Sequence, residues 1–344
     1  MPDFVFYYPE GHEAHYSSGH PERPERIDAV VNALKEKGWW DLFPKTVPVL
    51  LPEEVLWNIH DPGYLSDLFQ TCKNGGWLDG DTYTTPASWN LALQTAGGTA
   101  AVAEAIWSGK ELRGFSITRP PGHHAKRSAG SGFCLINNIA VAAEFLFQER
   151  KAQRLAILDL DLHHGNGTQD IFFKRNDLLF ISIHQYPLYP FSGRLEERGE
   201  GPGLGYTFNF PMAPRSGDDA YLMVMNELVL PELESFSPEM ILISFGFDAH
   251  WLDPLGGLNL SANGYYQIMR MISAWSEIYC QGKMMLVLEG GYNLEAARAC
   301  TQACIAGVLG ECWDDQIGLS SIPNSDYWKI NFEKAKLIWQ KLKD

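Results

Sequence analysis

The 344-residue sequence predicts a single α/β domain with a mostly parallel sheet and helices on both faces. Three observations favour this fold class. Short, continuously apolar segments are typical of strands buried on both faces, helical patterns alternate with them, and no linker-like tract separates the two kinds of segment. The length would also suit two average domains. Because each Gly- and Pro-rich loop directly follows a strand and none is typical of a linker, we expect one domain over residues 1–344, with a core over about 3–312 and a C-terminal extension over 313–344.

Apolar segments of five or six residues are the predicted strands. Right-handed crossovers between parallel strands place their carboxyl ends at one edge of the sheet, where open α/β sheets bind ligands. The predicted strands are Phe4–Tyr8, Gly114–Thr118, Leu155–Leu160, Leu179–His184, Met240–Phe245 and Met284–Leu288.

Amphipathic or apolar stretches between these segments are the predicted helices. They are Glu25–Lys37, Ser88–Trp107, Asn138–Arg150, Asp218–Leu233, Ala262–Tyr279 and Leu294–Leu309, followed by a surface helix over Asn331–Lys343. Loops rich in Gly and Pro are expected to form the site. They are Pro120–Gly132, Tyr186–Gly205 and Asp253–Gly257.

The composition excludes several classes of function. With 42 acidic and 27 basic residues the net charge is −15, which argues against binding nucleic acid through its phosphates. The N-terminal sequence lacks the basic and apolar regions of a secretory signal, and no apolar run approaches the ~18 residues of a membrane span. The six cysteines are too sparse for a disulfide scaffold, so we expect packed thiols and a cytoplasmic location.

Three ionisable residues alternate with leucines where the strand Leu155–Leu160 runs into a loop. Asp159, Asp161 and His163 share one face, and the intervening leucines occupy the other. Three such groups at a buried strand end are costly unless they are paired or bind a metal. A hydrogen-bonded strand terminus would explain one carboxylate but not three in register.

Asp248 follows the strand Met240–Phe245 and brings another carboxylate to the same edge. Asp161, His163 and Asp248 together offer two oxygens and one nitrogen and leave a coordination position open. Three protein ligands with an open position are typical of a catalytic zinc. This donor set also suits Fe(II), Co(II) or Mn(II), so the residues alone do not identify the metal.

Two further segments place polar side chains at this edge of the sheet. The adjacent histidines His123 and His124 follow the strand Gly114–Thr118, and Tyr292 follows the pair Gly290-Gly291 after the last strand. A tyrosine after two glycines is as consistent with simple packing as with a functional role.

The sequence resembles the histone deacetylase and acetylpolyamine amidohydrolase superfamily, and in detail the class II deacetylases and their bacterial relatives. The resemblance spans nearly the whole chain and depends on the order of several motifs. They are GHPERPER (19–26), PPGHHA (120–125), GSGFCLINN (130–138), DLDLHHGNGTQD (159–170), GFDAHWLDPLGG (246–257) and LEGGYN (288–293).

The resemblance implies the arginase/deacetylase fold, with a central parallel eight-stranded sheet, and hydrolysis of an N-acetyl amide at a zinc ion. Asp161, His163 and Asp248 match the zinc ligands of the family. Tyr292 matches the residue that polarises the substrate carbonyl.

The tandem histidines match those beside the metal-bound water in the family, with Asp159 behind His123 and Asn166 behind His124. A carboxylate favours the imidazolium form more than a neutral amide does. We therefore expect His124 to act as general base and then general acid, and His123 to remain cationic.

Substrate and potassium sites are also implied by the resemblance. The residues in substrate-binding positions are Gly132, Phe133, Tyr189, Leu255 and Gly290. A first structural potassium site corresponds to Asp159, Asp161, His163, Ser182 and Ile183. A second site, in which the family uses mostly backbone oxygens, corresponds to Phe172, Arg175, Leu178 and Tyr206.

The expected substrate is a small-molecule or peptide acyl-amine, either of acetyl-lysine type or an acetylated polyamine. Acetylpolyamine enzymes carry a long insertion near the N-terminus, whereas Gly19–Val31 runs directly into a helix, which favours acetyl-lysine. A binuclear ureohydrolase and an inactive acyl-binding module are weaker alternatives. No nucleic-acid or membrane partner is expected, and the oligomeric state remains open.

Overall fold

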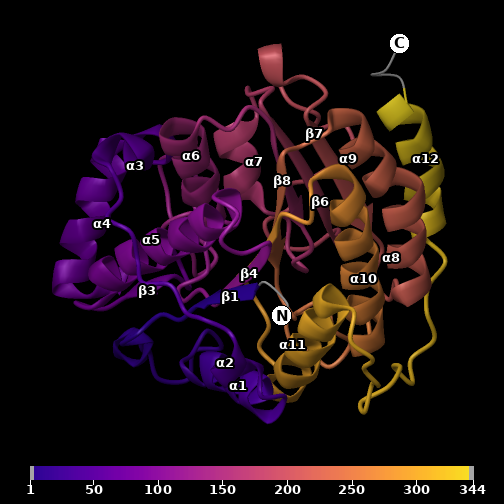
Figure 1. Cartoon of the computed structure of the whole chain (residues 1–344), viewed down its shortest axis with the longest axis horizontal. Coiled ribbons are helices and arrows are strands. Elements are labelled where there is room, and N and C mark those ends of the chain that lie inside the picture. The colour runs from indigo at the N-terminus through magenta and orange to yellow at the C-terminus, as the bar shows by residue number, and fades with distance from the viewer. Residues whose placement is uncertain (1–3, 341–344) are drawn as a thin grey trace.

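The protein is built around a parallel sheet of seven strands within residues 4–340, the part that the computed structural model describes. The strands run in the order β1-β4-β9-β8-β5-β6-β7, and helices cover both faces (Figure 1). Their bounds are β1 Phe4–Tyr7, β4 Arg113–Ser116, β5 Leu155–Asp159, β6 Leu178–Gln185, β7 Thr207–Met212, β8 Met240–Phe245 and β9 Met284–Leu288. The predicted single α/β domain with a parallel sheet is confirmed.

The expectation of eight strands is wrong, since the sheet has seven in the described chain. Beyond β1, the edge is covered by an irregular segment in which Lys45 makes a single parallel bridge to Phe6. The Thr46 amide donates to the Phe6 carbonyl at 2.8 Å, and the Pro44 carbonyl accepts from Phe6 at 2.9 Å. Pro44 and Pro48 lack amide hydrogens, so this segment does not continue a regular ladder.

β7 is a strand that the sequence analysis did not predict. Its sequence, TFNFPM, contains Asn209 and Pro211, which interrupt the apolar pattern. Pro211 is compatible with this position because β7 is an edge strand. The six predicted strands are all present, with bounds that are identical or differ by one or two residues.

Two layers of helices pack on the sheet. Side chains of β1 alternate between them: Phe4 and Phe6 belong to one apolar cluster, and Val5 and Tyr7 belong to the other. In Figure 1, α3 to α6 lie on one side of the sheet and α8 to α12 on the other. The helices are α1 Glu25–Glu36, α2 Trp39–Leu42, α3 Glu53–Ile59, α4 Pro62–Asn74, α5 Ser88–Trp107, α6 Asn138–Arg150, α7 Asn166–Phe172, α8 Asp218–Val224, α9 Leu230–Phe236, α10 Ala262–Tyr279, α11 Leu294–Leu309 and α12 Trp328–Gln340.

One predicted helix is divided in the structure. The segment predicted as Asp218–Leu233 forms α8, a π-helical turn over Met225–Val229, and α9. Pro231 lies in the first turn of α9 and lacks an amide hydrogen, so the regular α-helical hydrogen bond is lost there. The π turn accommodates this loss without ending the helical path.

The C-terminal helix covers the β7 edge of the sheet. Trp339 contacts Phe208 of β7 with ring centroids 4.8 Å apart, and Trp328 and Phe332 are buried on the same face of α12. The helix begins three residues before the predicted Asn331, and the predicted end at Lys343 lies outside the described residues. Within the described chain, no helix combines the length and apolar character that a bilayer span requires.

We predict that Gly98→Ala destabilises the fold. Gly98 lies on α5 against β1, and a methyl group there would overlap the buried ring of Tyr7. Overpacking typically costs about 1–3 kcal/mol, which exceeds the gain of up to about 1 kcal/mol in helix propensity. The free energy of unfolding, measured in urea, should therefore fall.

Gly63→Ala on α4 is the matched control, because a methyl group there meets nothing within 4 Å. It should leave stability unchanged or raise it. A Gly98→Ala protein as stable as the Gly63→Ala protein would contradict this account of the packing between α5 and β1.

Candidate active site

Three potential metal ligands come together at the carboxyl edge of the sheet. Asp161 and His163 follow β5, and Asp248 follows β8, which pairs directly with β5. One donor atom from each of the three lies within 4.8 Å of the others. His163 Nδ1 is 3.3 Å from Asp161 Oδ1 and 3.2 Å from Asp248 Oδ2. The structure thus brings the three predicted zinc ligands together.

The chemistry of this cluster fits a divalent cation. Gly290 donates its amide to Asp161 Oδ2 at 2.9 Å, and Leu162 donates to Asp248 Oδ1 at 3.1 Å. Asp248 Oδ2 is buried, and although His163 Nδ1 lies 3.2 Å away, it accepts no well-directed hydrogen bond within the described residues. An oxygen without a partner in a buried site is costly, and a metal ion bound to all three ligands would satisfy it.

The electrostatics of the two aspartates support the same conclusion. Burial, and then repulsion by Asp161, raise the pKa of Asp248. Burial also opposes ionisation of Asp161, but the charges of His123 and His163 outweigh it and hold the pKa of that carboxyl well below its usual range. Two fully buried carboxylates so close together require compensating positive charge.

The two adjacent histidines have different partners. His123 Nδ1 lies 3.0 Å from Asp159 Oδ2, whereas His124 Nδ1 lies 2.7 Å from Asn166 Oδ1. Because Asn166 offers an oxygen, His124 carries its hydrogen on Nδ1, which leaves Nε2 as the acceptor. The two rings are 4.0 Å apart between centroids.

These partners separate the protonation states of the two histidines. Burial opposes the charge of His123, but Asp161 and Asp159 outweigh it and raise its pKa to about 10. Burial, together with the charges of His123 and His163, lowers the pKa of His124 well below its usual value. One imidazole is therefore cationic while its neighbour is neutral.

Tyr292 is held at the end of β9 by Asp253. Its amide donates to Asp253 Oδ2 at 2.6 Å, and the Asn293 amide donates to the same oxygen at 3.1 Å. The ring is 9% exposed and contacts the edge of Phe133 at 5.8 Å between centroids. Asp253, the first residue of the predicted site-forming loop Asp253–Gly257, thus positions Tyr292.

Beneath Tyr292 lies a buried ion network that sequence reasoning missed. Arg26 is centred 4.9 Å from the Tyr292 ring and donates to the Gly291 carbonyl at 2.6 Å. Glu22 accepts from Arg26 at 3.1 Å and from Arg119 at 2.8 Å. Burial opposes ionisation of Glu22, but the two arginines lower its pKa to about 2. The repeated charges of GHPERPER signalled this network, although charged residues are usually interpreted as exposed.

Glu289 orders the loop that carries the histidine pair. Its Oε2 accepts from the amides of Gly122 at 2.7 Å and His123 at 3.1 Å. Glu289 itself is fully buried. His164 is likewise hydrogen-bonded, to Ser192 at 2.8 Å and Gln169 at 3.1 Å, which is consistent with a structural role.

A pocket of about 390 Å³ leads to these groups. Its walls include all five residues in predicted substrate positions: Gly132, Phe133, Tyr189, Leu255 and Gly290. His123, His124, His163 and Tyr292 line the same pocket. His20 and Asp81 also line it and were not predicted as site residues; the His20 Nε2 lies 2.9 Å from the Asp81 carbonyl.

The predicted potassium residues fall in two places. Asp159 of β5 pairs in register with Ser182 of β6, next to Ile183, so the first set lies beside the metal ligands. In the second set, the Phe172 and Tyr206 carbonyls already accept amides at 2.9 Å, and Leu178 begins β6. The Arg175 guanidinium binds Glu144 at 2.6 Å and Asp177 at 2.7 Å.

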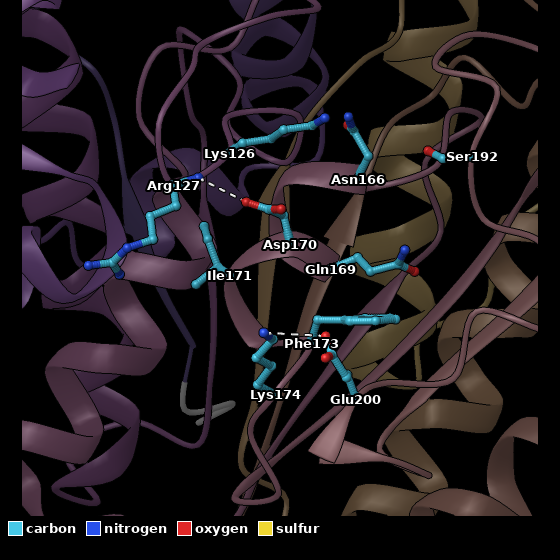
Figure 2. A pocket seen from close by; sticks show the side chains of 10 residues that line it. All are labelled: Lys126, Arg127, Asn166, Gln169, Asp170, Ile171, Phe173, Lys174, Ser192 and Glu200. Atoms are coloured by element: carbon cyan, nitrogen blue, oxygen red, sulfur yellow. Dashed lines mark hydrogen bonds and ion pairs between the residues drawn. The ribbon is translucent and has the colours of Figure 1, made fainter. Parts of the chain in front are cut away.

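A larger cavity, of about 560 Å³, is lined by Asn166 together with residues of α7 and neighbouring loops (Figure 2). Its charged groups are exposed and partly paired, as between Lys174 and Glu200 at 3.3 Å. The Arg127 amide also donates to Asp170 at 3.3 Å. Neither of the adjacent histidines lines it. Convergence of buried ionisable groups, rather than cavity volume, therefore identifies the candidate site.

Comparison with known proteins agrees with this geometry. Residues 20–308 match the model of the Histone deacetylase domain family. The chain is 42% identical to a "Probable deacetylase" of Archaeoglobus fulgidus over 299 residues, 85% of this chain and 82% of that protein. It is 36% identical to the "Histone deacetylase-like amidohydrolase" of Pseudomonas aeruginosa, over 86% of this chain and 78% of that protein.

A solved structure, "Crystal Structure of HDA15 HD domain", superposes with a TM-score of 0.90 at 32% identity. The match covers 99% of this chain and 96% of that one. The predicted resemblance to the superfamily is confirmed by these findings.

We predict that one divalent ion binds per chain and stabilises the protein. Adding Zn²⁺ to chelator-treated protein should raise the melting temperature, since a ligand at 100 times its Kd stabilises by about 2.7 kcal/mol. Asp248→Asn should abolish this increase. It should also raise the melting temperature of the metal-free protein, because it removes a buried charge that Asp161 repels.

Asp170→Asn, at an exposed carboxylate outside the cluster, is the control and should behave as wild type. Calorimetry measures the melting temperature, and elemental analysis measures the number of ions bound per chain. Two tightly bound ions per chain would contradict the single site and favour a binuclear enzyme.

Proposed function

The chain belongs to the histone deacetylase family, and we propose that it is a zinc-dependent amidohydrolase that removes an acetyl group from an acetyl-lysine type substrate. The observation that carries the proposal is the meeting of three groups at the end of one pocket. They are the Asp161–His163–Asp248 cluster, the histidine pair with its unlike partners, and Tyr292.

Zinc is the proposed metal, with Fe(II), Co(II) and Mn(II) as alternatives, and Asp161, His163 and Asp248 would hold it. A bound divalent ion supplies Lewis acidity, which polarises a carbonyl and lowers the pKa of water. Two carboxylate oxygens and one imidazole nitrogen match a catalytic site that keeps a position open.

His124 is the proposed general base and then general acid. His124 lines the pocket, and its Nε2 carries no proton because Nδ1–H donates to Asn166. It takes a proton from the attacking water and returns it to the leaving amine. His123, held cationic by Asp159, stabilises the negative charge that develops on the substrate oxygen.

Tyr292 is the proposed hydrogen-bond donor to the substrate carbonyl. Burial raises the pKa of its hydroxyl well above the usual value, so the group stays protonated and can donate. Arg26 behind the ring and Asp253 at its amide fix its orientation. Donors that are already aligned require no reorganisation as charge develops.

Potassium is proposed as a structural ion. Asp159, Asp161, His163, Ser182 and Ile183 would form the first site, which the register between Asp159 and Ser182 supports. A second ion would bind at Phe172, Arg175, Leu178 and Tyr206, since a carbonyl that accepts one amide keeps a second lone pair.

Acyl-lysine is favoured over acetylpolyamine by the N-terminal region, because α1 begins at Glu25 without a preceding insertion. Phe133, Tyr189 and Leu255 line the pocket with apolar surface suited to the methylene groups of either carrier. All six cysteines are free, which supports a reducing compartment such as the cytoplasm.

The ureohydrolase and inactive-module alternatives receive less support. The described residues contain one candidate metal cluster, and it has three members. The groups needed for hydrolysis all line one pocket or adjoin it.

The histidine assignment predicts a distinctive effect of Asn166→Asp. A carboxylate behind His124 would raise the pKa of that imidazole. The base form would then be lost at higher pH, so the acid limb of the kcat/KM profile should move to higher pH. Activity at pH 6 should fall more than activity at pH 8.

A second experiment compares the kcat of the His124→Ala variant with that of the His123→Ala variant. Loss of the general base should cost about 10²–10⁴-fold in kcat, more than loss of the electrostatic partner. A more severe defect in His123→Ala, with an unshifted profile for Asn166→Asp, would reverse the assignment.

The proposed substrate class is tested with metal-analysed protein. Peptides carrying internal acetyl-lysine should be hydrolysed with higher kcat/KM than acetylputrescine. Preference for acetylputrescine would favour the acetylpolyamine alternative, and inactivity on every acyl-amine would contradict the proposed function.

A further inference from the structure

A second cleft, of about 230 Å³, adjoins the pocket that leads to the candidate metal site. His20, Pro21 and Tyr292 line both of them. These three residues therefore form a shared boundary, with the acyl-binding pocket on one side and the second cleft on the other. The second cleft also contacts Arg23 and Glu25.

Arg23 is an unpaired cation in this cleft. Its side chain is half-buried, and its guanidinium has no hydrogen-bond or ion-pair partner within the described part of the chain. Nearby Arg26, in contrast, pairs with Glu22 at 3.1 Å. In a chain with 42 acidic and 27 basic residues, an arginine without a carboxylate is available for an anion from outside.

Glu25 supplies the opposite charge on the same cleft. It is the first residue of α1, is exposed, and likewise lacks a side-chain partner among residues 4–340. Arg23 and Glu25 do not pair with each other, although one residue separates them. The cleft thus offers one cation and one anion to a ligand.

The carrier of an acyl-amine would arrive at this boundary. If the substrate carbonyl lies at Tyr292 and its methylene groups lie against Phe133 and Leu255, the carrier would lie against the remaining lining residues of the pocket. Of these, His20 and Pro21 also line the second cleft. For an acyl-lysine, the group that emerges is the α-carbon with its substituents. These substituents are then next to the cleft that holds Arg23.

We propose that this cleft binds the zwitterionic head group of a free Nε-acyl-lysine. Arg23 binds the α-carboxylate and Glu25 binds the α-ammonium. The proposal rests on the proposed function and narrows its substrate class to acyl-amines whose carrier is an amino acid. A guanidinium binds a carboxylate through paired, charge-assisted hydrogen bonds, whereas it repels the ammonium groups of a polyamine.

The test compares three acyl-amines of equal chain length with the zinc-loaded protein. They are free Nε-acetyl-lysine, the same compound blocked as Nα-acetyl amide, and N-acetylcadaverine, which lacks the carboxylate. Wild type should hydrolyse free Nε-acetyl-lysine with the highest kcat/KM. Arg23→Gln should lower the ratio of kcat/KM for free Nε-acetyl-lysine over N-acetylcadaverine about tenfold, mainly through KM.

Glu25→Gln should lower the preference for the free amino acid over the blocked form. Lys37→Gln, at an exposed cation just after α1, is the matched control and should leave both ratios unchanged. Equal kcat/KM for the three compounds in wild type would overturn the proposal. An equal loss on all three in Arg23→Gln would also overturn it, since Arg23 would then act only through the structure.

Failure of the proposed function has a different signature, namely no hydrolysis of any of the three compounds. In that case calorimetric titration with free Nε-acetyl-lysine tests the cleft. Binding that is at least tenfold weaker in Arg23→Gln supports the proposal, and equal binding by wild type and variant overturns it.

Discussion

The burial of four carboxylates at one edge of the sheet is the constraint on which the rest of the site depends. Asp159, Asp161, Asp248 and Glu289 are all fully buried at the ends of β5, β8 and β9, which are neighbours in the sheet. Burial raises the pKa of Asp159 and Asp248, and raises that of Glu289 to about 7. A site with this much buried negative charge requires positive charge nearby. His123 supplies part of it, and a divalent cation at the cluster would supply the rest.

Backbone geometry provides the remaining compensation. Amides of the loops point at the carboxylates, as Gly290 does toward Asp161 and Gly122 toward Glu289. A side chain at Gly246 would overlap Asp161 and Asp248, so the chain can approach the acids this closely only where a side chain is missing. The glycines of these motifs are therefore needed for the close approach of backbone to carboxylate, in addition to any role in turning the chain.

Much of the fold and site could be predicted because both depend on local patterns. Continuously apolar strands such as Met240–Phe245 are identifiable without tertiary information, and alternation places Asp161 and His163 on one face of an extended segment. We did not predict β7 because Asn209 and Pro211 interrupt its apolar pattern. These two residues are compatible with a strand at this position because β7 lies at the edge of the sheet, which α12 covers. The number of strands was wrong because it came from the resemblance, and no local pattern in the chain specified an eighth strand.

The features that could not be predicted depend on contacts between distant segments. Glu22 lies 97 residues from its partner Arg119, and neither position has a local pattern that marks it as buried. The difference between His123 and His124 could be predicted only in part. Their adjacency is evident in the sequence, but their pKa values are set by Asp159 and Asn166, which reach them from β5 and α7.

The residues proposed for the reaction and the residues that line the pocket come from different parts of the fold. Groups such as Asp161 and Asp248, which follow strands of a rigid sheet, are set in place by backbone pairing. The pocket walls come instead from loops, with Tyr189 from one and Asp81 from another, and loops tolerate change without loss of the sheet. The reaction type can therefore be inferred from motifs that follow strands. The side chains proposed to select the carrier, such as Arg23, have neighbours that only the folded chain defines.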